Sequence, residues 1–320
     1  MASAKYILDF EKPIVELEKK IQEMKESSAS EHIDLSEDIT KLESKLDQLR
    51  QNIFSKLTNW QRVQLARHPE RPYPLDYIER ICSNFEELHG DRYFGDDHAV
   101  VAVMGIIENE KVMICAHQKG RDTKSNLYRN FGMPNPEGLR KALRVMKLGA
   151  KFGRPIVTFI DTPGAFPGKG AEERGISDAI ARNLYEMATL PVPILTVVTG
   201  EGGSGGALAL SVADRILMME YSMYSVISPE GCASILYRDS TKASIAADSL
   251  KLTAPDLLEL KVVDGTIPEP IGGAHRNYDE MAKILKARIL KELNELKKMD
   301  TEQRINERIE KYGKMGFWEE

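Results

Sequence analysis

A cluster of glycines constrains this chain more than any other feature. The segment GEGGSGG at residues 200–206 has five glycines in seven positions and directly follows the apolar run PILTVVT at 193–199. The β-branched residues of that run favour a buried strand, and the residues after the turn favour a helix. A parallel strand that ends in a glycine turn before a helix presents backbone N–H groups at the sheet edge where ligands collect. We therefore expect the chemistry of this chain at residues 200–206.

Strand and helix patterns alternate on both sides of this turn. The expected elements are strands over 99–107, 111–117, 155–161, 193–199, 215–220 and 223–228, and helices over 137–152, 171–189 and about 203–213. Such alternation, with nearly continuous β-branched strands, favours a mostly parallel sheet covered by helices on its faces. Ahead of these elements, helical spacing predicts a helix through Ile78, Ile81, Phe85 and Leu88. The fold class expected from the residues is therefore α/β.

The two ends of the chain differ from its middle. All but two of the 23 glycines lie between Gly90 and Gly273, whereas both ends are rich in charge. Before residue 58, apolar residues recur at helical spacing in two blocks separated by a polar stretch, which predicts a helical hairpin. After residue 275 the same spacing predicts a long amphipathic helix. We expect a helical extension at 1–57, a catalytic domain at 58–275 and a second helical extension at 276–320.

Composition argues against several classes of protein. The net charge of −5 provides no overall attraction for nucleic acid. No apolar run approaches the length of a membrane span, and the N-terminus lacks the basic and apolar regions of a secretory signal. Cys82, Cys115 and Cys232 form no Cys-x-x-Cys pair, so neither a disulfide framework nor a structural zinc site is expected. We expect a cytoplasmic protein that binds no membrane, no nucleic acid and no metal of its own.

Two interpretations of the glycine turn assign it a known motif. Residues 200–205 match the dinucleotide fingerprint G-x-G-x-x-G, and Glu220 follows at the distance expected of its acidic residue. Ser204 is also the centre of G-x-S-x-G, the nucleophile elbow of α/β hydrolases, with Asp264 and His275 in the chain order of that class. A dinucleotide-binding protein and a serine hydrolase therefore both remain open at this point.

A third interpretation uses the backbone alone. Gly205 and Gly206 open the expected helix, where their N–H groups would stabilise an oxyanion. A second turn of the same kind, DTPGAFPGKG at 161–170, follows the strand at 155–161. Two glycine turns at the ends of successive parallel strands are expected to face one pocket. The remaining alternative is structural, because glycine also permits close packing of a helix on a strand.

Longer motifs support a resemblance to a known family. They are HQKGRDTK (117–124), RNFGMPNPEGLRKALR (129–144), DTPGAFPG (161–168), EERGISDAIARNL (172–184), GEGGSGGALAL (200–210), YSVISPEGCASILY (224–237) and IPEPIGGAHRN (267–277). With these motifs the chain resembles the carboxyltransferase alpha subunits of bacterial- and plastid-type acetyl-CoA carboxylase. The resemblance runs from FEKPIVELE near the N-terminus to the helix after His275 and leaves only about the last 20 residues uncovered.

The resemblance implies a fold, a reaction and partners. The fold is crotonase-like (ClpP/crotonase), with stacked ββα units between the two helical extensions. The reaction moves a carboxyl group from carboxybiotin, presented by the biotin carboxyl carrier protein, to acetyl-CoA, and malonyl-CoA forms for fatty-acid biosynthesis. The alpha chain is active only with a beta subunit, in an α2β2 assembly. It holds no cofactor alone, because zinc belongs to the beta subunit and ATP is used by the biotin carboxylase component.

The resemblance also implies site residues. The family's backbone oxyanion hole for the biotin enolate falls on Gly205 and Gly206. Gly164 and Ala165 lie where crotonase-like proteins place the other oxyanion-side amide. In the basic loop at 117–124, Lys119 and Arg121 are expected to face a substrate phosphate or a partner chain. The notable alternative for this loop is a solvated charged surface.

Overall fold

One mixed sheet forms the centre of the computed structural model, which describes residues 6–31 and 34–316. Its strands are β1 (Asn84–Glu87), β2 (Val100–Ile107), β3 (Glu110–His117), β4 (Ile156–Thr162), β5 (Ile194–Gly203), β6 (Arg215–Met219), β7 (Met223–Ser225) and β8 (Gly265–Ile267). The order is β1-β2-β3-β4-β5-β6-β8, and β7 pairs with β5 outside this path. The first three strands pair antiparallel and the others parallel. The α/β class expected from the sequence is confirmed.

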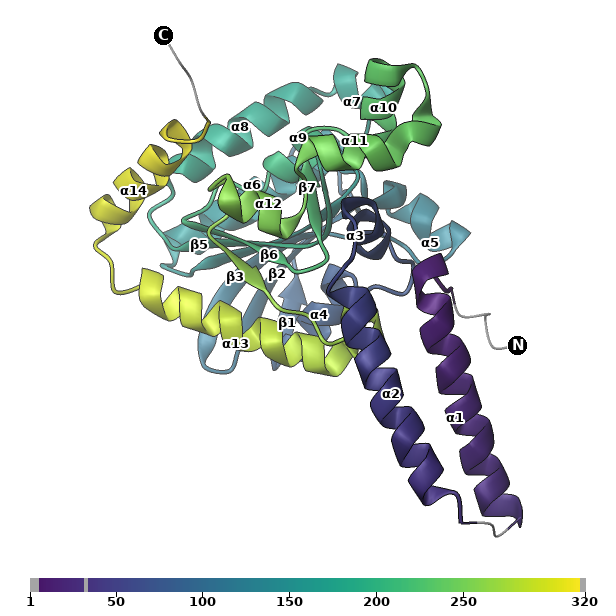
Figure 1. Cartoon of the computed structure of the whole chain (residues 1–320). Helices are drawn as coiled ribbons and strands as arrows, with labels where there is room; N and C mark the ends of the chain where they lie inside the picture. The colour runs from purple at the N-terminus through teal and green to yellow at the C-terminus, as the bar shows by residue number, and fades with distance from the viewer. Residues whose placement is uncertain (1–5, 32–33, 317–320) are drawn as a thin grey trace.

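Helices cover both faces of this sheet (Figure 1). Their bounds are α1 (Lys12–Glu31), α2 (Ser36–Phe54), α3 (Asn59–Ala66), α4 (Pro74–Ile81), α5 (Thr123–Tyr128), α6 (Pro136–Lys151), α7 (Lys169–Glu173), α8 (Ile176–Thr189), α9 (Ser204–Leu208), α10 (Pro229–Tyr237), α11 (Ala243–Leu250), α12 (Ala254–Glu259), α13 (Tyr278–Leu296) and α14 (Thr301–Gly313). Successive residues of β4 point to opposite faces. Ile156 packs in the core under α6 and α8, and Val157 packs in the core under α4 and α13.

The glycine turn differs from its expected shape. The strand expected over 193–199 continues to Gly203 in β5, and the helix expected over 203–213 is only the five-residue α9. The cause is β7, whose residues Met223–Ser225 pair with Glu201–Gly203 and hold the glycines extended. Because these partners lie 22 residues apart in sequence, local patterns did not predict the pairing.

Three helical expectations are corrected at their ends. The helix through Ile78 and Ile81 stops at Ile81, because Phe85 belongs to β1 and pairs with Gly105 of β2. The helix expected over 171–189 is divided into α7 and α8 at Gly175, whose φ of 81° is left-handed. The helix after residue 275 is divided into α13 and α14, and the Asp300 side chain caps the second. Residues 317–320 of that extension lie outside the described residues.

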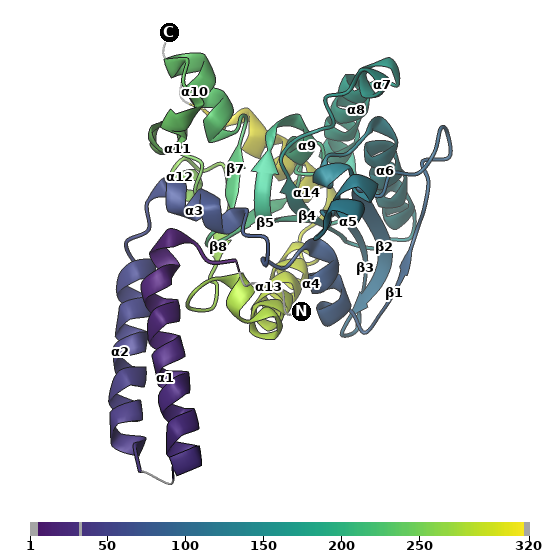
Figure 2. The same cartoon turned by 90° about the vertical axis from the view of Figure 1, so that its right-hand side faces the viewer.

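The N-terminal hairpin forms as expected, with α1 beside α2. It projects from the body in both views (Figures 1 and 2). Its base is buried, since Leu8, Ile14 and Phe54 cluster with Leu65 and Tyr221 of the body. Toward its far end the apolar residues are only partly buried. Within the described residues, none of the helices has the length and apolar character that a membrane crossing requires.

Candidate active site

The two glycine turns contact each other at the ends of β4 and β5. Thr162 pairs with Gly202 across these strands. A Cβ added at Gly203 would lie 2.1 Å from the carbonyl oxygen of Pro163, and one at Gly206 would lie 2.4 Å from the amide nitrogen of Ala165. Only glycine permits this approach. The turn that contains Ala165 therefore lies directly against the first turn of α9.

Helix α9 begins with an unusual backbone at Ser204, whose φ is 53°. The left-handed conformation turns β5 sharply into the helix. The N–H groups in the first turn of a helix have no partner inside it. Among the described residues, no hydrogen bond occupies the N–H group of Gly205 or of Gly206. The turn thus offers two adjacent backbone donors.

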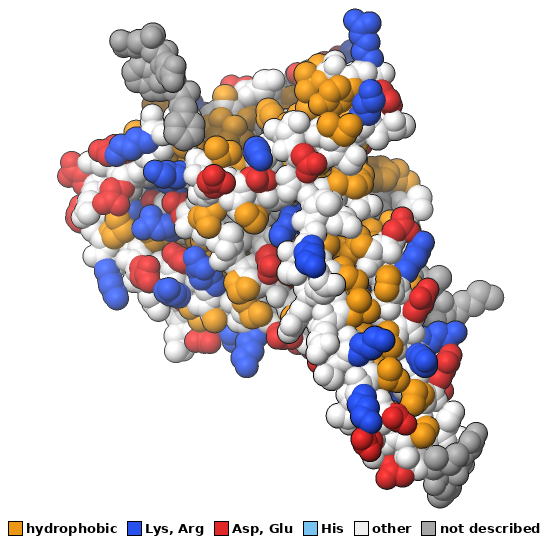
Figure 3. All heavy atoms as spheres, in the orientation of Figure 1, with side chains coloured by type: hydrophobic (Ala, Val, Ile, Leu, Met, Phe, Trp, Pro, Cys, Tyr) orange, Lys and Arg blue, Asp and Glu red, His pale blue; other side chains and the backbone are white. Residues whose placement is uncertain are grey.

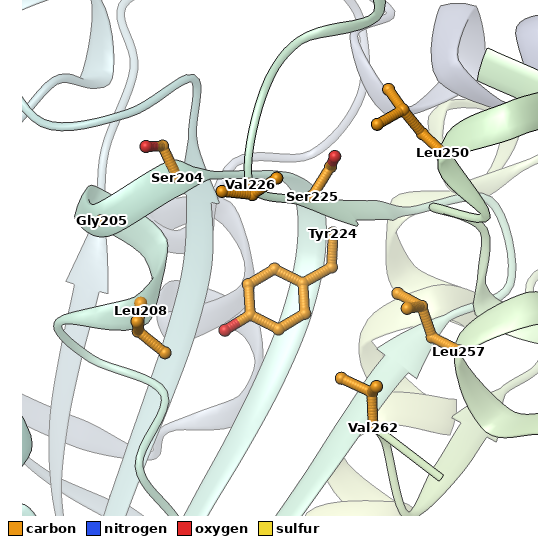
Figure 4. A pocket seen from close by; sticks show the side chains of 9 residues that line it. All are labelled: Ser204, Gly205, Leu208, Tyr224, Ser225, Val226, Leu250, Leu257 and Val262. Atoms are coloured by element: carbon orange, nitrogen blue, oxygen red, sulfur yellow. The ribbon is translucent and has the colours of Figure 1, made fainter. Parts of the chain in front are cut away.

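A cavity of about 330 Å³ opens beside this turn. Figure 4 shows Gly205 at its rim and the side chains of Leu208, Tyr224, Leu257 and Val262 around the same space. Burial raises the pKa of Tyr224 above its ordinary value, so its phenol stays neutral. The cavity therefore has apolar walls and a polar rim, which suits a flat polar head group on an aliphatic chain.

The two loop cations predicted to face a substrate are held in ion pairs. Lys119 Nζ lies 2.7 Å from Asp161 Oδ1 and 3.2 Å from Glu201 Oε2. Arg121 pairs with Asp76, and its guanidinium lies 4.4 Å from the centre of the Tyr73 ring. Lys119 is only 13% exposed. Lys119 is therefore not part of a solvated surface and points inward beneath the glycine turns, whereas residues 121–124 of the loop are exposed.

His117 ends β3 and is fully buried. Burial lowers its pKa to about 3, which outweighs the opposite effect of the nearby backbone of Gly206. The imidazole is therefore neutral at pH 7. Because no part of its side chain reaches solvent, it cannot meet a substrate as a general base.

The hydrolase triad is not assembled. The His275 imidazole lies 3.1 Å from Glu11 Oε1 and stacks on the His68 ring. Asp264 accepts the N–H group of Ile216 and has its own lysine partner. In the part of the chain that the structure describes, no hydrogen bond joins Ser204 to His275. Ser204 therefore has the backbone of a nucleophile elbow without its base.

The dinucleotide interpretation also lacks its acidic partner. Glu220 Oε2 accepts the N–H group of Glu269 at 3.2 Å, so this carboxylate is used within the fold. Gly202, the central glycine of the fingerprint, is paired to β7 as a strand residue. A Rossmann unit requires a helix of several turns after its glycines, whereas α9 has five residues.

A buried Glu11, His68 and His275 cluster is the group with metal-ligand residue types among the described residues. Its chemistry does not suit a metal. His68 Nδ1 accepts the N–H group of Glu70, which leaves the proton of the neutral ring on Nε2. Nε2 lies 3.8 Å from Glu11 Oε2, beyond hydrogen-bond distance, and carries a proton where a metal requires a lone pair. Arg276 lies 3.4 Å from the same carboxylate and adds a positive charge. The cluster instead joins the N-terminal segment to the body.

Comparisons with known proteins agree with these observations. Residues 7–316 match the family described as "Acetyl co-enzyme A carboxylase carboxyltransferase-like". The acetyl-coenzyme A carboxylase carboxyl transferase subunit alpha of Geobacter metallireducens is 57% identical over 99% of this chain and 100% of its own length. The subunit of the same name from Geobacter sulfurreducens is 60% identical over 98% of each chain.

Solved structures show the fold. The transcarboxylase 12S core, solved with methylmalonyl-coenzyme A, has a TM-score of 0.53 at 22% identity, and the match covers 67% of this chain and 41% of that one. A Pseudomonas malonate decarboxylase hetero-tetramer in complex with coenzyme A has a TM-score of 0.57 at 15% identity, over 69% of this chain and 87% of that one. The crotonase-like fold implied by the sequence is confirmed.

Proposed function

The chain belongs to the acetyl-coenzyme A carboxylase carboxyltransferase family, whose reaction is biotin-linked carboxyl transfer, and we propose that it supplies the biotin side of an active site completed by a beta subunit. In this proposal the biotin carboxyl carrier protein delivers the carboxyl group, acetyl-CoA accepts it, and malonyl-CoA is formed for fatty-acid biosynthesis. One observation carries the proposal: Gly205, whose backbone N–H group is unoccupied, lies at the rim of a cavity with apolar walls, and the unoccupied N–H group of the buried Gly206 is next to it in sequence.

Carboxybiotin supplies an activated carboxyl group whose departure leaves negative charge on the ureido oxygen. The N–H groups of Gly205 and Gly206 donate to that oxygen. Fixed donors of this kind stabilise developing charge without reorganisation, and removal of one typically costs about 2.7–4 kcal/mol of transition-state stabilisation. Leu208, Tyr224 and Val262 line the space for the aliphatic part of the biotin arm and exclude water from the donors.

Gly164 and Ala165 have a supporting role in this proposal. Gly164 has a φ of 154°. Its peptide packs so closely against Gly206 that a Cβ added at Gly206 would lie 2.5 Å from the carbonyl carbon of Gly164. Thr162 Oγ1 accepts the N–H group of Gly164 at 3.1 Å, which fixes the turn locally. The second turn thus acts as a rigid support for the first, and the oxyanion side of the site is built from both.

We propose that the beta subunit covers the surface around α10 and α11. Hydrophobic side chains gather over these helices in Figure 3, and the most exposed are Val226, Ile235, Leu236 and Ile245. Val226 also lines the cavity, so this surface is continuous with the site. Exposed apolar area of this kind is typical of protein interfaces. Zinc in the beta subunit and ATP use by the biotin carboxylase component complete the proposed assembly.

The three cysteines are free thiols, as is usual in a reducing compartment, and we place the enzyme in the cytoplasm. We also propose that the N-terminal hairpin serves assembly rather than chemistry. A chain that begins at residue 58 would then fold, as judged by circular dichroism, and would associate more weakly with the beta subunit. Full association of the truncated chain would remove this role from the hairpin.

The direct test reconstitutes the chain with a zinc-ribbon beta subunit and follows malonyl-CoA formation. Gly205→Pro removes one N–H group and is expected to lower kcat about 10²- to 10³-fold. Gly205→Ala is the matched control, because it keeps the N–H group and its Cβ meets only the flexible end of Ile180 at 3.2 Å. Equal activity of the proline and alanine variants would refute the oxyanion assignment. Failure of the wild-type complex to form malonyl-CoA would refute the proposed reaction.

A further inference from the structure

We propose that Lys119, Asp161 and Glu201 are positioning residues, which hold the glycine end of β5 so that the Gly205 and Gly206 donors keep a fixed direction. The inference rests on the proposed function and adds to it three buried charges that do not touch substrate. Glycine backbone has more conformational freedom than any other, so a donor pair built on it requires a rigid support.

Asp161 is the centre of this support. Its Oδ1 accepts the backbone N–H group of Glu201 at 3.0 Å and lies 2.7 Å from Lys119 Nζ. The same oxygen would lie 2.7 Å from a Cβ at Gly200. One carboxylate therefore binds the backbone of β5 at the first residues of the glycine segment. Since Asp161 itself belongs to β4, it fixes the two turns relative to each other.

Lys119 joins the two carboxylates. Its Nζ lies 3.2 Å from Glu201 Oε2 as well as contacting Asp161. Gly132 covers the lysine stem, because a Cβ there would lie 2.6 Å from Lys119 Cγ, and Gly132 has a φ of 77°. Two left-handed residues, Asn130 and Phe131, precede it. A strained loop of this kind persists only where the surrounding structure holds it.

The charges continue outward from Glu201. Arg67, which directly follows α3, donates to Glu201 Oε1 at 2.8 Å and to Glu230 of α10 at 2.7 Å. The charges therefore alternate in sign from Asp161 to Glu230 and connect β4, β5 and α10. Arg71 adds an independent contact, since its Nε donates to the carbonyl of Thr199 in β5 at 2.8 Å. Side chains from other segments of the chain therefore hold β5 at the residues next to its glycines.

Lys119 and Glu201 stabilise each other's charged form. Burial alone would lower the pKa of Lys119, but Asp161 and Glu201 raise it above its ordinary value. Burial alone would raise the pKa of Glu201, but Lys119 and Arg67 hold it below its ordinary value. Loss of Lys119 would leave two carboxylates facing each other, and their repulsion would act directly on the backbone of β5.

The test compares Lys119→Met with Lys311→Met in the complex with the beta subunit. Both lysines are largely buried, at 13% and 17% exposed, and both pair with an aspartate. Lys311 pairs with Asp264, which precedes β8 and lies at the opposite edge of the sheet. We expect Lys119→Met to lower kcat about 10- to 100-fold, because a small displacement of the donors suffices for such a loss. We expect the KM for the CoA substrate to change less than about threefold. Lys311→Met should keep the wild-type kcat.

A second variant separates position from simple destabilisation. Asp161→Asn keeps an oxygen that accepts the Glu201 N–H group, whereas Asp161→Ala removes it. We expect Asp161→Asn to retain at least about tenfold more kcat than Asp161→Ala at equal melting temperature. The inference fails if Lys119→Met loses no more kcat than Lys311→Met, or if its loss is confined to the KM for the CoA substrate. The inference can fail in this way while the proposed function stands. That outcome is recognised by an active wild-type complex together with an inactive Gly205→Pro variant.

Discussion

A buried carboxylate paired with a cation occurs at both the carboxyl and the amino edge of the sheet, but its role differs between the two edges. At the carboxyl edge, Asp161 accepts the N–H group of Glu201 and pairs with Lys119. At the amino edge, Asp214 accepts the N–H group of Ile194 at 2.7 Å and pairs with Arg308. In both places a buried carboxylate binds a strand amide and a cation from a neighbouring element. The difference lies in what the device supports.

At the amino edge the network only closes the fold. Arg308 of α14 binds both oxygens of Asp214, at 2.8 and 2.9 Å, and donates to the carbonyls at the end of α8 and in the loop before β5. No glycine turn lies there, and the helix is fixed to the sheet by side chains. At the carboxyl edge the network instead holds the glycine turn, which presents the backbone N–H groups of Gly205 and Gly206. The first network should therefore control stability and the second should control rate.

The largest effect expected from this contrast is on stability, at Arg308. Arg308→Met removes the cation that binds both oxygens of the buried Asp214 and leaves it only Arg304, at 3.9 Å. Removal of one partner from a buried ion pair typically costs about 3–5 kcal/mol. Urea unfolding of the purified chain measures the loss. Arg182→Met is the control, because Arg182 is 62% exposed and its replacement should change the unfolding free energy by less than about 0.5 kcal/mol. A loss below about 1 kcal/mol at Arg308 would contradict the assignment of the amino edge to stability.

The next effect is on rate, at Gly203. Gly203→Ala forces the turns apart, because its Cβ would lie 2.1 Å from the Pro163 carbonyl oxygen. We expect kcat of the complex to fall about 100-fold, as for a displacement of about 1 Å at a reacting group. Gly95→Ala is the matched control, since nothing lies within 4 Å of its Cβ and its φ is ordinary. Wild-type kcat in Gly203→Ala would show that contact between the turns is dispensable.

Local patterns predicted much of this carboxyl edge. β-branched runs identified β4 and β5, and clustered glycines identified both turns. The length of β5 was missed, because its last residues are held by β7. The cavity was missed as well, because Leu208 and Val262 come from distant segments.

The positioning charges were missed for a related reason. A sequence shows Lys119 in a basic loop, where solvation and substrate contact are the natural expectations. Its true partners are 42 and 82 residues away, and the pairing of β4 with both β3 and β5 brings them together. One signal was available in retrospect: Asp161 and Glu201 are acidic residues beside glycine turns, at strand ends that are otherwise apolar.

A smaller effect concerns acid stability. Burial lowers the pKa of His117 to about 3 and that of His68 to about 4. Between pH 6.5 and 5 the unfolded chain binds protons that the folded chain does not, so the unfolding free energy falls as the pH falls. Each histidine contributes about 2 kcal/mol to that fall. His117→Gln should therefore flatten the pH dependence measured by urea unfolding. Equal slopes in the wild-type chain and in His117→Gln would refute the role of His117.

The smallest effect is expected at Ser204. It tests most directly whether the carboxyl edge acts through backbone groups and the amino edge through side chains. If the carboxyl edge works through backbone alone, the hydroxyl of Ser204 is unnecessary, although this residue has the left-handed φ of 53° that a nucleophile elbow requires. Ser204→Ala should keep kcat of the complex within about twofold, because it removes neither an N–H group nor a packing contact. Ser204→Gly, which relieves the left-handed strain, controls for backbone effects. Hydrolysis of a p-nitrophenyl ester by the isolated chain, lost in Ser204→Ala and kept in a Gly205→Ala control, would overturn the backbone assignment and restore a serine nucleophile.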